Sequence, residues 1–256
     1  MRTLNYDRAT GIISDFLLSR IALGEQNGVV VGISGGVDSA LTAALATLAQ
    51  GKEKVLGLIM PYFDTADVED AQLVCTHLDI PYKLISIKPV VDAFLQQLEA
   101  LEPDTITKGN LMARTRMMLL YAHANREHRF VLGTGNRSEW LTGYFTKWGD
   151  GACDLAPILP LYKTEVWEMG KRLGLPSRIL SKPPSAGLWI GQTDEGELGI
   201  SYQELDKILY FLTEKKYTPL HVARELNIPL EKVSQVDAMM RSTAHKRHMP
   251  EAPVLY

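Results

Sequence analysis

The stretch VVVGISGGVDSALTAAL (29–45) carries the residue types best suited to chemistry in this chain. Hydrophobic residues run into a tight SGG turn (34–36), which leads through Asp38 and Ser39 into an alanine-rich segment. This order predicts a strand, a turn and a helix. Glycines let the backbone approach an oxygen-rich ligand, hydroxyls donate hydrogen bonds, and a helix N-terminus has unpaired amides with partial positive charge. The turn is therefore predicted to bind phosphate.

The pattern differs from the two common phosphate loops. A Walker loop has Lys and then Ser or Thr after its last glycine, but Val37 and Asp38 stand there, and the glycines lack G-x-G-x-x-G spacing. Asp38 would repel a polyphosphate unless a divalent cation lay between them. Mg²⁺ is commonly held by one or two carboxylates together with phosphate oxygens. From the residues alone, Asp38 could instead cap the helix.

Short apolar runs alternate with helical patterns along the first half of the chain. The runs rich in Val, Ile, Leu and aromatic residues predict four strands, at 29–34, 55–60, 82–87 and 130–135. Nearly continuous hydrophobicity indicates burial on both faces, and strand-helix-strand repetition predicts parallel pairing. We therefore expect an α/β fold with a doubly wound, mostly parallel sheet flanked by helices. In such sheets ligands bind at the carboxyl edge, where the glycine turn lies.

Two segments depart from this alternation. A long helical pattern over 108–126 precedes the fourth strand, and the segment 181–201 is rich in Pro, Gly and acidic residues without periodicity. The second segment is expected to be a mobile loop. Three short helices are predicted after it, at 202–213, 219–226 and 230–242. We expect them to form a small C-terminal helical region capping the sheet, with 1–256 as a single domain.

Composition limits the possible partners. The formal net charge is −3 with a pI near 6.1, and no segment concentrates Lys and Arg, so nucleic acid is an unexpected partner. No stretch approaches eighteen apolar residues and the N-terminus lacks a secretory pattern, so we expect no membrane association and a cytoplasmic location. Cys75 and Cys153 stand in unrelated contexts and are expected to be reduced thiols.

Several blocks of the sequence resemble one enzyme family. SGGVDS (34–39) resembles the pyrophosphate loop of the ATP pyrophosphatase superfamily. The blocks that resemble NAD synthetase, in the same order, are KGNLMARTRM (108–117), the segment 131–166, SKPPSAGL (181–188), DEGELGISYQELD (194–206) and AHKRHMP (244–250). This resemblance implies ATP-dependent amidation of deamido-NAD with ammonia, through an acyl-adenylate, giving NAD, AMP and pyrophosphate with Mg²⁺.

The resemblance also implies roles for individual positions. The ATP positions are Gly32, Ile33, Ser34, Gly35, Gly36, Val37, Asp38, Ser39, Thr134, Lys163 and Ser185, with the backbone at Met60 added by fold analogy. The family has Thr where this chain has Ser185. The magnesium ligands would be Asp38 and Glu139. The deamido-NAD positions are Arg114, Lys147, Asp154, His245 and Lys246. The catalytic positions would be Asp38, Asp154 and Lys163.

The residues themselves leave alternatives open at several positions. Glu139 follows Asn136 by three, so the pair could form a helix capping box. On the long helix, the expected shared face holds Asn110, Arg114, Met117, Met118 and Tyr121. Arg116 would point elsewhere, as a solvated or ion-paired side chain, and Tyr121 is either core or a ring-stacking surface.

Ammonia chemistry adds two expectations. An acid, Asp154 or less favourably Asp150, would bind ammonium and accept its proton, because only neutral ammonia attacks an acyl group. Residues 181–201 would form a lid that keeps water from the adenylate. About thirty residues before the first strand cannot house a glutamine amidase, so free ammonia is the expected donor, with a separate ammonia-supplying partner left open.

Members of this size resemble homodimers in which both subunits contribute to the deamido-NAD pocket. Two rival functions remain at this point. One is another adenylating ATP pyrophosphatase, such as a tRNA-thiolating or GMP-forming enzyme, although no basic RNA face, catalytic thiol pair or extra dimerisation domain is visible. The other is a module that binds ATP without turnover. Asp38, Glu139 and Lys163 argue against such a passive binder.

Overall fold

The computed structural model describes residues 2–189, 191–253 and 255. Its sheet has four strands, all parallel, in the order β3-β2-β1-β4. The strands are β1 Gly28–Gly32, β2 Val55–Ile59, β3 Tyr82–Leu84 and β4 Arg129–Leu132. The predicted parallel α/β fold is confirmed. Each strand is shorter than expected, and the residues of β3 lie exposed at the edge of the sheet, so the expected burial of all four strands is wrong for β3.

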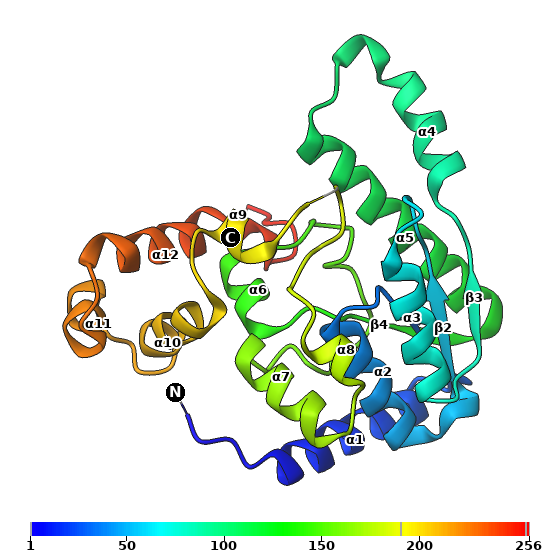
Figure 1. The fold of residues 1–256 in the computed structure, drawn as a ribbon, viewed down its shortest axis with the longest axis horizontal. Helices are drawn as coiled ribbons and strands as arrows, with labels where there is room; N and C mark the ends of the chain where they lie inside the picture. Colours follow the sequence, from blue (N-terminus) through cyan, green and yellow to red (C-terminus); the bar gives the residue numbers. More distant parts are fainter. Residues whose placement is uncertain (1, 190, 254, 256) are drawn as a thin grey trace.

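Helices connect and flank the strands (Figure 1). They are α1 Tyr6–Leu23, α2 Val37–Gln50, α3 Ala66–His77, α4 Lys88–Gln97, α5 Thr105–Glu127, α6 Arg137–Thr142, α7 Lys163–Arg172, α8 Ser177–Leu180, α9 Asp194–Leu198, α10 Tyr202–Thr213, α11 Pro219–Leu226 and α12 Leu230–Ser242. Short 3₁₀ turns span Lys52–Lys54, Glu99–Leu101 and Ala244–Lys246. The predicted long helix before β4 is α5, and it extends past both expected ends.

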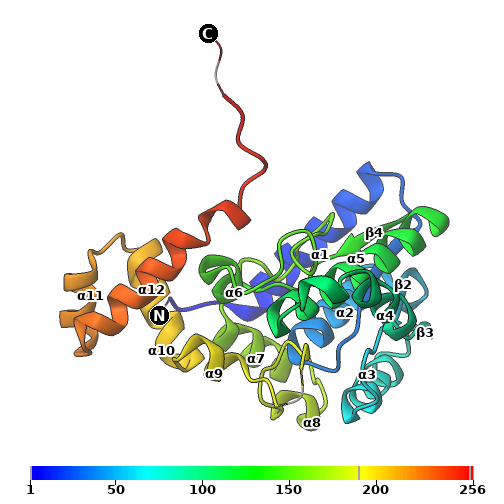
Figure 2. The same cartoon turned by 90° about the horizontal axis from the view of Figure 1, so that it is seen from above.

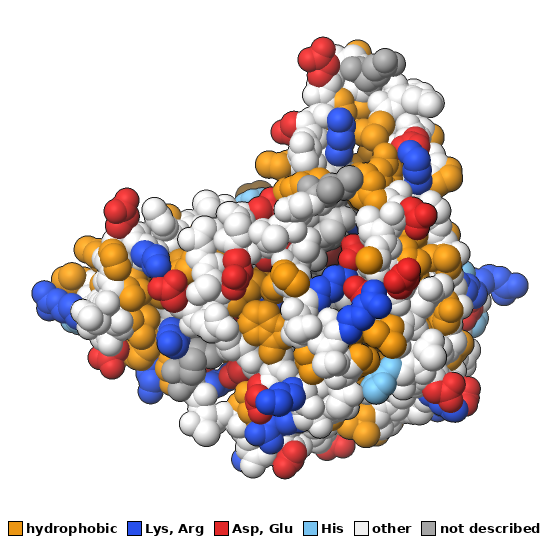
Figure 3. Space-filling model, in the orientation of Figure 1, with side chains coloured by type: hydrophobic (Ala, Val, Ile, Leu, Met, Phe, Trp, Pro, Cys, Tyr) orange, Lys and Arg blue, Asp and Glu red, His pale blue; other side chains and the backbone are white. Residues whose placement is uncertain are grey.

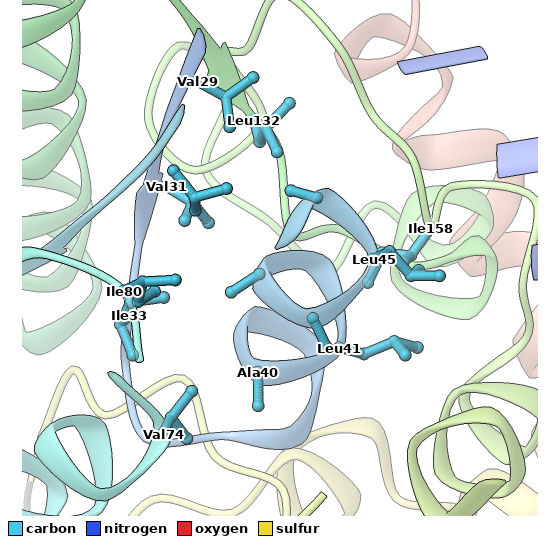
Figure 4. Close-up of a cluster of buried hydrophobic side chains, with 14 of the residues drawn as sticks. Val29, Val31, Ile33, Ala40, Leu41, Leu45, Val74, Ile80, Leu132 and Ile158 are labelled. Carbon is cyan, nitrogen blue, oxygen red and sulfur yellow. The ribbon is translucent and has the colours of Figure 1, made fainter. Parts of the chain in front are cut away.

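The two faces of the sheet bury alternate residues of β1. Val29 and Val31 pack with α1, α2 and α7 in one core, whereas Val30 packs with α4 and α5 in another. Figure 4 shows Val29 and Val31 beside Leu132 of β4 and facing α2. All three valines are fully buried, which explains the continuous apolar run: a strand covered on both faces has no solvent side.

Strand order places the functional edge of the sheet. The chain moves outward from β1 to β2 and β3, then returns through α5 to place β4 on the other side of β1. The connections after β1 and β4 therefore leave the sheet in opposite directions and open a crevice at their carboxyl ends. The SGG turn follows β1, and Thr134 and Glu139 follow β4, so all of them lie at this switch point.

The three C-terminal helices match their predicted ranges. They have their own hydrophobic cluster, which Tyr162 joins from the start of α7. In Figures 1 and 2 these helices stand to one side of the sheet. The segment 181–201 was expected to lack periodic structure, but it contains the short helix α9, whose first turn is rich in acids. Ile190 of that segment lies outside the described residues, as do residues 1, 254 and 256 of the expected domain. No helix among the described residues has the length and apolar character needed to cross a membrane.

Candidate active site

The turn after β1 is braced by its own serines. The Ser34 amide donates to Ser39 Oγ at 3.2 Å, the Gly36 amide donates to Ser34 Oγ at 3.3 Å, and Ser39 Oγ donates to the Gly36 carbonyl at 3.1 Å. Gly35 has a left-handed backbone with φ of 79°. The first amides of α2 have no partner within their helix and point towards the turn. The turn thus presents a rigid set of N–H groups to an anion.

Two carboxylates and one ammonium group meet beside this turn. Lys163, the first residue of α7, contacts the Asp38 carboxylate and places its Nζ 3.6 Å from Glu139 Oε1. The Lys163 side chain is only 3% exposed. Its charge stands at a helix N-terminus, where a cation is disfavoured, so the two acids stabilise it there. The grouping joins the ends of β1 and β4 with the start of α7.

The charges of this group depend on one another. Burial, together with repulsion from Asp38, raises the pKa of Glu139 to about 8. Burial alone would lower the pKa of Lys163, but Asp38 and Glu139 outweigh it and hold the pKa above its usual value. Lys163 therefore keeps its proton. A cation between the two acids is needed for both to remain ionised.

Glu139 takes part in a helix capping box and also belongs to the charged group beside the turn. Asn136 and Glu139 form a capping box, in which the Asn136 amide donates to Glu139 Oε2 at 3.1 Å and Asn136 Oδ1 accepts from the Glu139 amide at 3.0 Å. Asn136 Nδ2 also donates to Asp38 Oδ1 at 2.9 Å. The cap therefore fixes the Glu139 carboxylate opposite Asp38 rather than competing with that placement.

A buried network holds Lys163 in register. Asp206 of α10 is completely buried, and it accepts from Ser138 Oγ and from the Thr164 amide. Ser138 Oγ in turn accepts from the Lys163 amide at 3.0 Å. Because these partners belong to α6, α7 and α10, the C-terminal helices fix the geometry of the site even though they do not belong to the sheet.

A cavity of about 790 Å³ opens above this cluster. Figure 3 shows basic and acidic side chains beside one another near the centre of the hollowed face. The predicted site residues that line the cavity are Gly32, Ile33, Ser34, Gly36, Val37, Asp38, Ser39, Met60, Thr134, Glu139, Lys163, Ser185 and Lys246. The structure therefore brings almost every predicted ATP position to one space.

Other predicted residues lie outside this lining: Gly35, Arg114, Lys147, Asp154 and His245. Arg114, Lys147 and His245 are linked to one another, and Asp154 bonds to Tyr121 of the same helix as Arg114. Arg114 donates to the Lys147 carbonyl at 3.3 Å, and Lys147 Nζ donates to the His245 carbonyl at 2.7 Å. Asp154 accepts from Tyr121 Oη at 3.2 Å and from the Val131 amide at 2.7 Å. Most of the predicted deamido-NAD positions thus share an outer surface of α5 and its neighbours.

The two arginines of α5 lie on different faces, as expected, but Arg116 is not the solvated or ion-paired side chain that the sequence suggested. Arg116 lines the cavity and donates from Nε to the Met60 carbonyl at 3.0 Å, whereas Arg114 lies on the exposed side. The cavity face of α5 is formed by Asn110, Ala113, Arg116, Met117 and Leu120. It is centred near Ala113, so it includes Asn110 and Met117 but leaves out Met118, which is 44% exposed.

Asp150 is the acid that the turn at 146–151 delivers to the cavity. It accepts from the Thr146 amide at 2.9 Å. Burial raises its pKa above the usual value of an aspartate, while the hydrogen bonds from Thr146 oppose that rise. Asp154, the acid favoured from the sequence, is exposed, and so is Asp150, but only Asp150 lines the cavity. The dense Gly-Asp-Gly pattern was the available signal for Asp150.

The segment 181–201 covers part of the cavity. Lys182 Nζ lies 2.6 Å from both Asp67 Oδ1 and Asp70 Oδ2 at the start of α3. Farther along, Glu197 accepts from Tyr144 Oη and from Gln192 Nε2. Sequence reasoning placed Lys182 in the loop but missed these partners, together with the lining residues Tyr144, Asp194 and Glu197. The acidic start of α9 and the acids of α3 were the only signals.

No group of three or more His, Cys, Asp or Glu side chains in the described parts of the chain has the arrangement of a metal site. Asp38 and Glu139 supply two carboxylates only. Such a pair suits a cation that takes its remaining ligands from phosphate oxygens and water, which is the usual manner of Mg²⁺ binding.

Comparison with known proteins identifies the family. The NAD synthase family model matches residues 10–250. The NH(3)-dependent NAD(+) synthetase of Pyrococcus horikoshii is 58% identical over 253 residues, covering 99% of this chain and 96% of that protein. The relative from Methanosarcina acetivorans, of the same name, is 46% identical and covers 99% of this chain and 100% of its own length.

Two solved structures share the fold over nearly the full chain. NMN synthetase from Francisella tularensis has a TM-score of 0.87 at 36% identity and covers 98% of this chain and 99% of its own. NH3-dependent NAD synthetase from Campylobacter jejuni has a TM-score of 0.84 at 32% identity and covers 98% of this chain and 100% of its own. Because the family model and these relatives extend over almost all of its length, the chain belongs to the NAD synthase family.

Proposed function

We propose that this protein catalyses the ATP-dependent amidation of deamido-NAD with ammonia, giving NAD, AMP and pyrophosphate through an acyl-adenylate. The main support is the meeting of Asp38, Glu139 and Lys163 beside the braced SGG turn, at the base of a cavity large enough for a nucleotide. A carboxylate resists attack by an amine because oxide is a poor leaving group. Attaching AMP to the carboxylate oxygen supplies a better one.

The charge of each group in the site determines the part of the substrate that it would bind. The amides of the turn and Lys163 would hold the phosphates and stabilise the charge that develops during adenylation. Bound Mg²⁺ would neutralise phosphate oxygens from the side of Asp38 and Glu139. The raised pKa of Glu139 supports this assignment, because a second positive charge beside it would keep both carboxylates ionised. Thr134 and Ser185, which both line the cavity, would add hydroxyl donors.

Adenine would be read at the end of β2. Ile59 and Pro61 accept from the Ile85 and Ile87 amides, so their carbonyls face β3, and Met60 between them faces the cavity. The Met60 N–H has no hydrogen-bond partner among the described residues. A peptide with a free N–H and a C=O on one edge complements N1 and the 6-amino group of adenine. This geometry supports the assignment of Met60 to ATP.

The ammonium-binding acid would be Asp150 or Asp154. Asp150 lines the cavity and its raised pKa suits an acceptor that must exchange protons, whereas Asp154 lies outside the cavity lining and accepts from Tyr121 of α5. We therefore give the proton-accepting role to Asp150 and keep Asp154 as a deamido-NAD contact. This order reverses the preference drawn from the sequence.

The predicted deamido-NAD positions lie largely on the surface, so a closed binding pocket would require a further element. Arg114, Lys147, Asp154 and His245 lie on the outside of this chain, and a second subunit placed over α5 would complete the pocket. A homodimer is therefore part of the proposal. Residues 1–256 would act as one unit, since residues from Gly32 to Lys246 line a single cavity. Two free cysteines suit a reducing compartment, the cytoplasm.

The lid proposal concerns residues 181–201. Twelve of the described residues of this segment line the cavity, from Lys182 to Glu197, and Leu188 packs on Gly109 of α5, where a Cβ would lie 3.0 Å from Leu188 Cδ1. Closure over the adenylate would keep water from the activated acyl group. Hydrogen exchange in this segment should slow when ATP and deamido-NAD are both bound. Unchanged exchange would remove the lid from the proposal.

A smaller substrate is the competing possibility, because the Francisella tularensis protein that shares 36% identity is an NMN synthetase. The decisive assay supplies ATP, Mg²⁺ and ammonium with either deamido-NAD or the deamidated form of NMN. We expect equimolar NAD and pyrophosphate with deamido-NAD, a much lower kcat/KM with the mononucleotide, and no product when glutamine replaces ammonium. Pyrophosphate release that is indifferent to deamido-NAD would contradict the proposal.

A further inference from the structure

The peptide after Met60 stands free of the sheet on its cavity side. Leu58 accepts from the Ile33 amide at 2.9 Å, which is the last backbone bond from the β1 side in the described chain. Beyond it, the chain after β1 turns away into the SGG loop. The N–H and C=O of Met60, the next residue on that side, therefore have no neighbouring strand to hold them.

Arg116 supplies the hydrogen bond to the Met60 carbonyl that a neighbouring strand would otherwise make. Its Nε donates to the Met60 oxygen at 3.0 Å, across 56 positions of the chain. A carbonyl oxygen has two lone pairs, so this bond leaves one available to a ligand.

The charge of Arg116 is not committed elsewhere. No carboxylate of the described chain lies within ion-pair distance of it, although the side chain is largely withdrawn from water. Burial lowers its pKa, and only the more distant Asp150 and Asp67 oppose that effect. Holding an unpaired guanidinium in such a place is unfavourable. The hydrogen bond to the Met60 carbonyl partly compensates the Arg116 guanidinium for its burial.

We infer that Arg116 is a positioning residue that makes the site select adenine, by fixing the orientation of the Met60 carbonyl. This inference rests on the proposed use of ATP. With the carbonyl fixed, the Met60 edge offers a donor to adenine N1 and an acceptor to its 6-amino group. Hypoxanthine presents N1–H and a 6-oxo group, so both contacts would become mismatched. Base selection then depends on how firmly the Met60 peptide is held.

The test compares binding of ATP and of inosine triphosphate to the whole protein, with Mg²⁺ present and deamido-NAD absent. The wild type should bind ATP the more tightly. In Arg116→Met the ratio of the two dissociation constants should fall by about tenfold, the usual effect of losing a charge-assisted hydrogen bond. Inorganic pyrophosphate, which lacks a base, should bind as before. Arg126→Met, an exposed position on the same helix, is the matched control and should keep the wild-type ratio.

Other results would overturn the inference. Equal weakening of ATP, inosine triphosphate and pyrophosphate would show that Arg116 binds phosphate instead, and an unchanged ratio would show that Met60 needs no support. If Arg116→Met does not fold, Arg116→Lys keeps the charge but lacks the planar Nε–H donor, and its ratio must still fall. Because these measurements need no turnover, failure of NAD formation would count against the proposed reaction and leave the role of Arg116 intact.

Discussion

Lys163 Nζ lies 3.6 Å from Oε1 of Glu139, and the two side chains come from different helices that start at the same edge of the sheet. The same ammonium group contacts Asp38 after β1. Lys163 thus partly offsets the repulsion between the two acids, although burial and Asp38 still raise the pKa of Glu139 to about 8. When ATP and Mg²⁺ bind, Lys163 would contact the triphosphate and the two acids would contact the magnesium ion.

Removing this cation should impair both stability and adenylation. Lys163→Met leaves Asp38 and Glu139 facing each other with no opposite charge, and breaking one partner of a buried ion pair costs about 3–5 kcal/mol. Urea denaturation should show the loss, and Mg²⁺ should recover part of it. Pyrophosphate release should fall by at least about a hundredfold, as for loss of a preorganised charge at a reacting centre. Lys171→Met, in the last turn of α7, is the control.

Two neighbouring glycines of the turn should behave differently. Gly35 has φ of 79°, and a Cβ there would lie 2.7 Å from the Asp67 carbonyl oxygen. Gly35→Ala should therefore destabilise the fold, by about 1–2 kcal/mol from the left-handed backbone alone. At Gly36 the nearest atom to a Cβ is Ser34 Oγ at 3.4 Å, an ordinary contact.

Gly36→Ala should fold normally but bind ATP poorly, because its methyl group would stand on the cavity side of the turn. Thermal unfolding and nucleotide titration of the two variants separate these effects. Normal ATP affinity in Gly36→Ala would mean that the phosphates do not approach this turn closely.

The pH dependence of ammonia use should reveal the accepting acid. Burial raises the pKa of Asp150, so its carboxylate forms at a higher pH than that of an ordinary aspartate. At a constant concentration of free ammonia, kcat/KM for ammonia should rise with pH through this ionisation. Asp150→Asn should lower the rate and remove the rise. If Asp154→Asn removes the rise instead, Asp154 is the acceptor and the assignment to Asp150 is wrong.

The two thiols should be slow to react in the native protein. Burial raises the pKa of Cys75 to about 12, and burial with the nearby Asp154 raises that of Cys153 to about 11. Since thiolate is the reactive form, iodoacetamide at pH 8 should leave Cys75 unmodified and label the half-buried Cys153 slowly. Both should react quickly in guanidinium chloride. Mass spectrometry of the two peptides gives the rates, and rapid native labelling of Cys75 would contradict its burial.

Local patterns in the sequence were sufficient for the elements themselves. The ranges of α10 and α11 match their predictions because start signals lie in the adjacent residues: Ser201 and Thr218 cap these helices, and Pro219 follows Thr218. The SGG turn, the strands around it and the parallel sheet were also predictable, since apolar runs and glycines act over a few residues. The family resemblance added the acids that belong with the turn.

Tertiary structure decided which side chains share the cavity. Periodicity placed Arg114 and Arg116 on different faces of α5, but only the position of β4 beside β1 determines which face covers the switch point. The choice between Asp150 and Asp154 likewise depends on how the turn at 146–151 folds back. Helical and strand periods repeat within one segment, whereas burial and charge pairing depend on segments more than a hundred residues apart, such as those of Asp38 and Lys163. No local pattern carries that information.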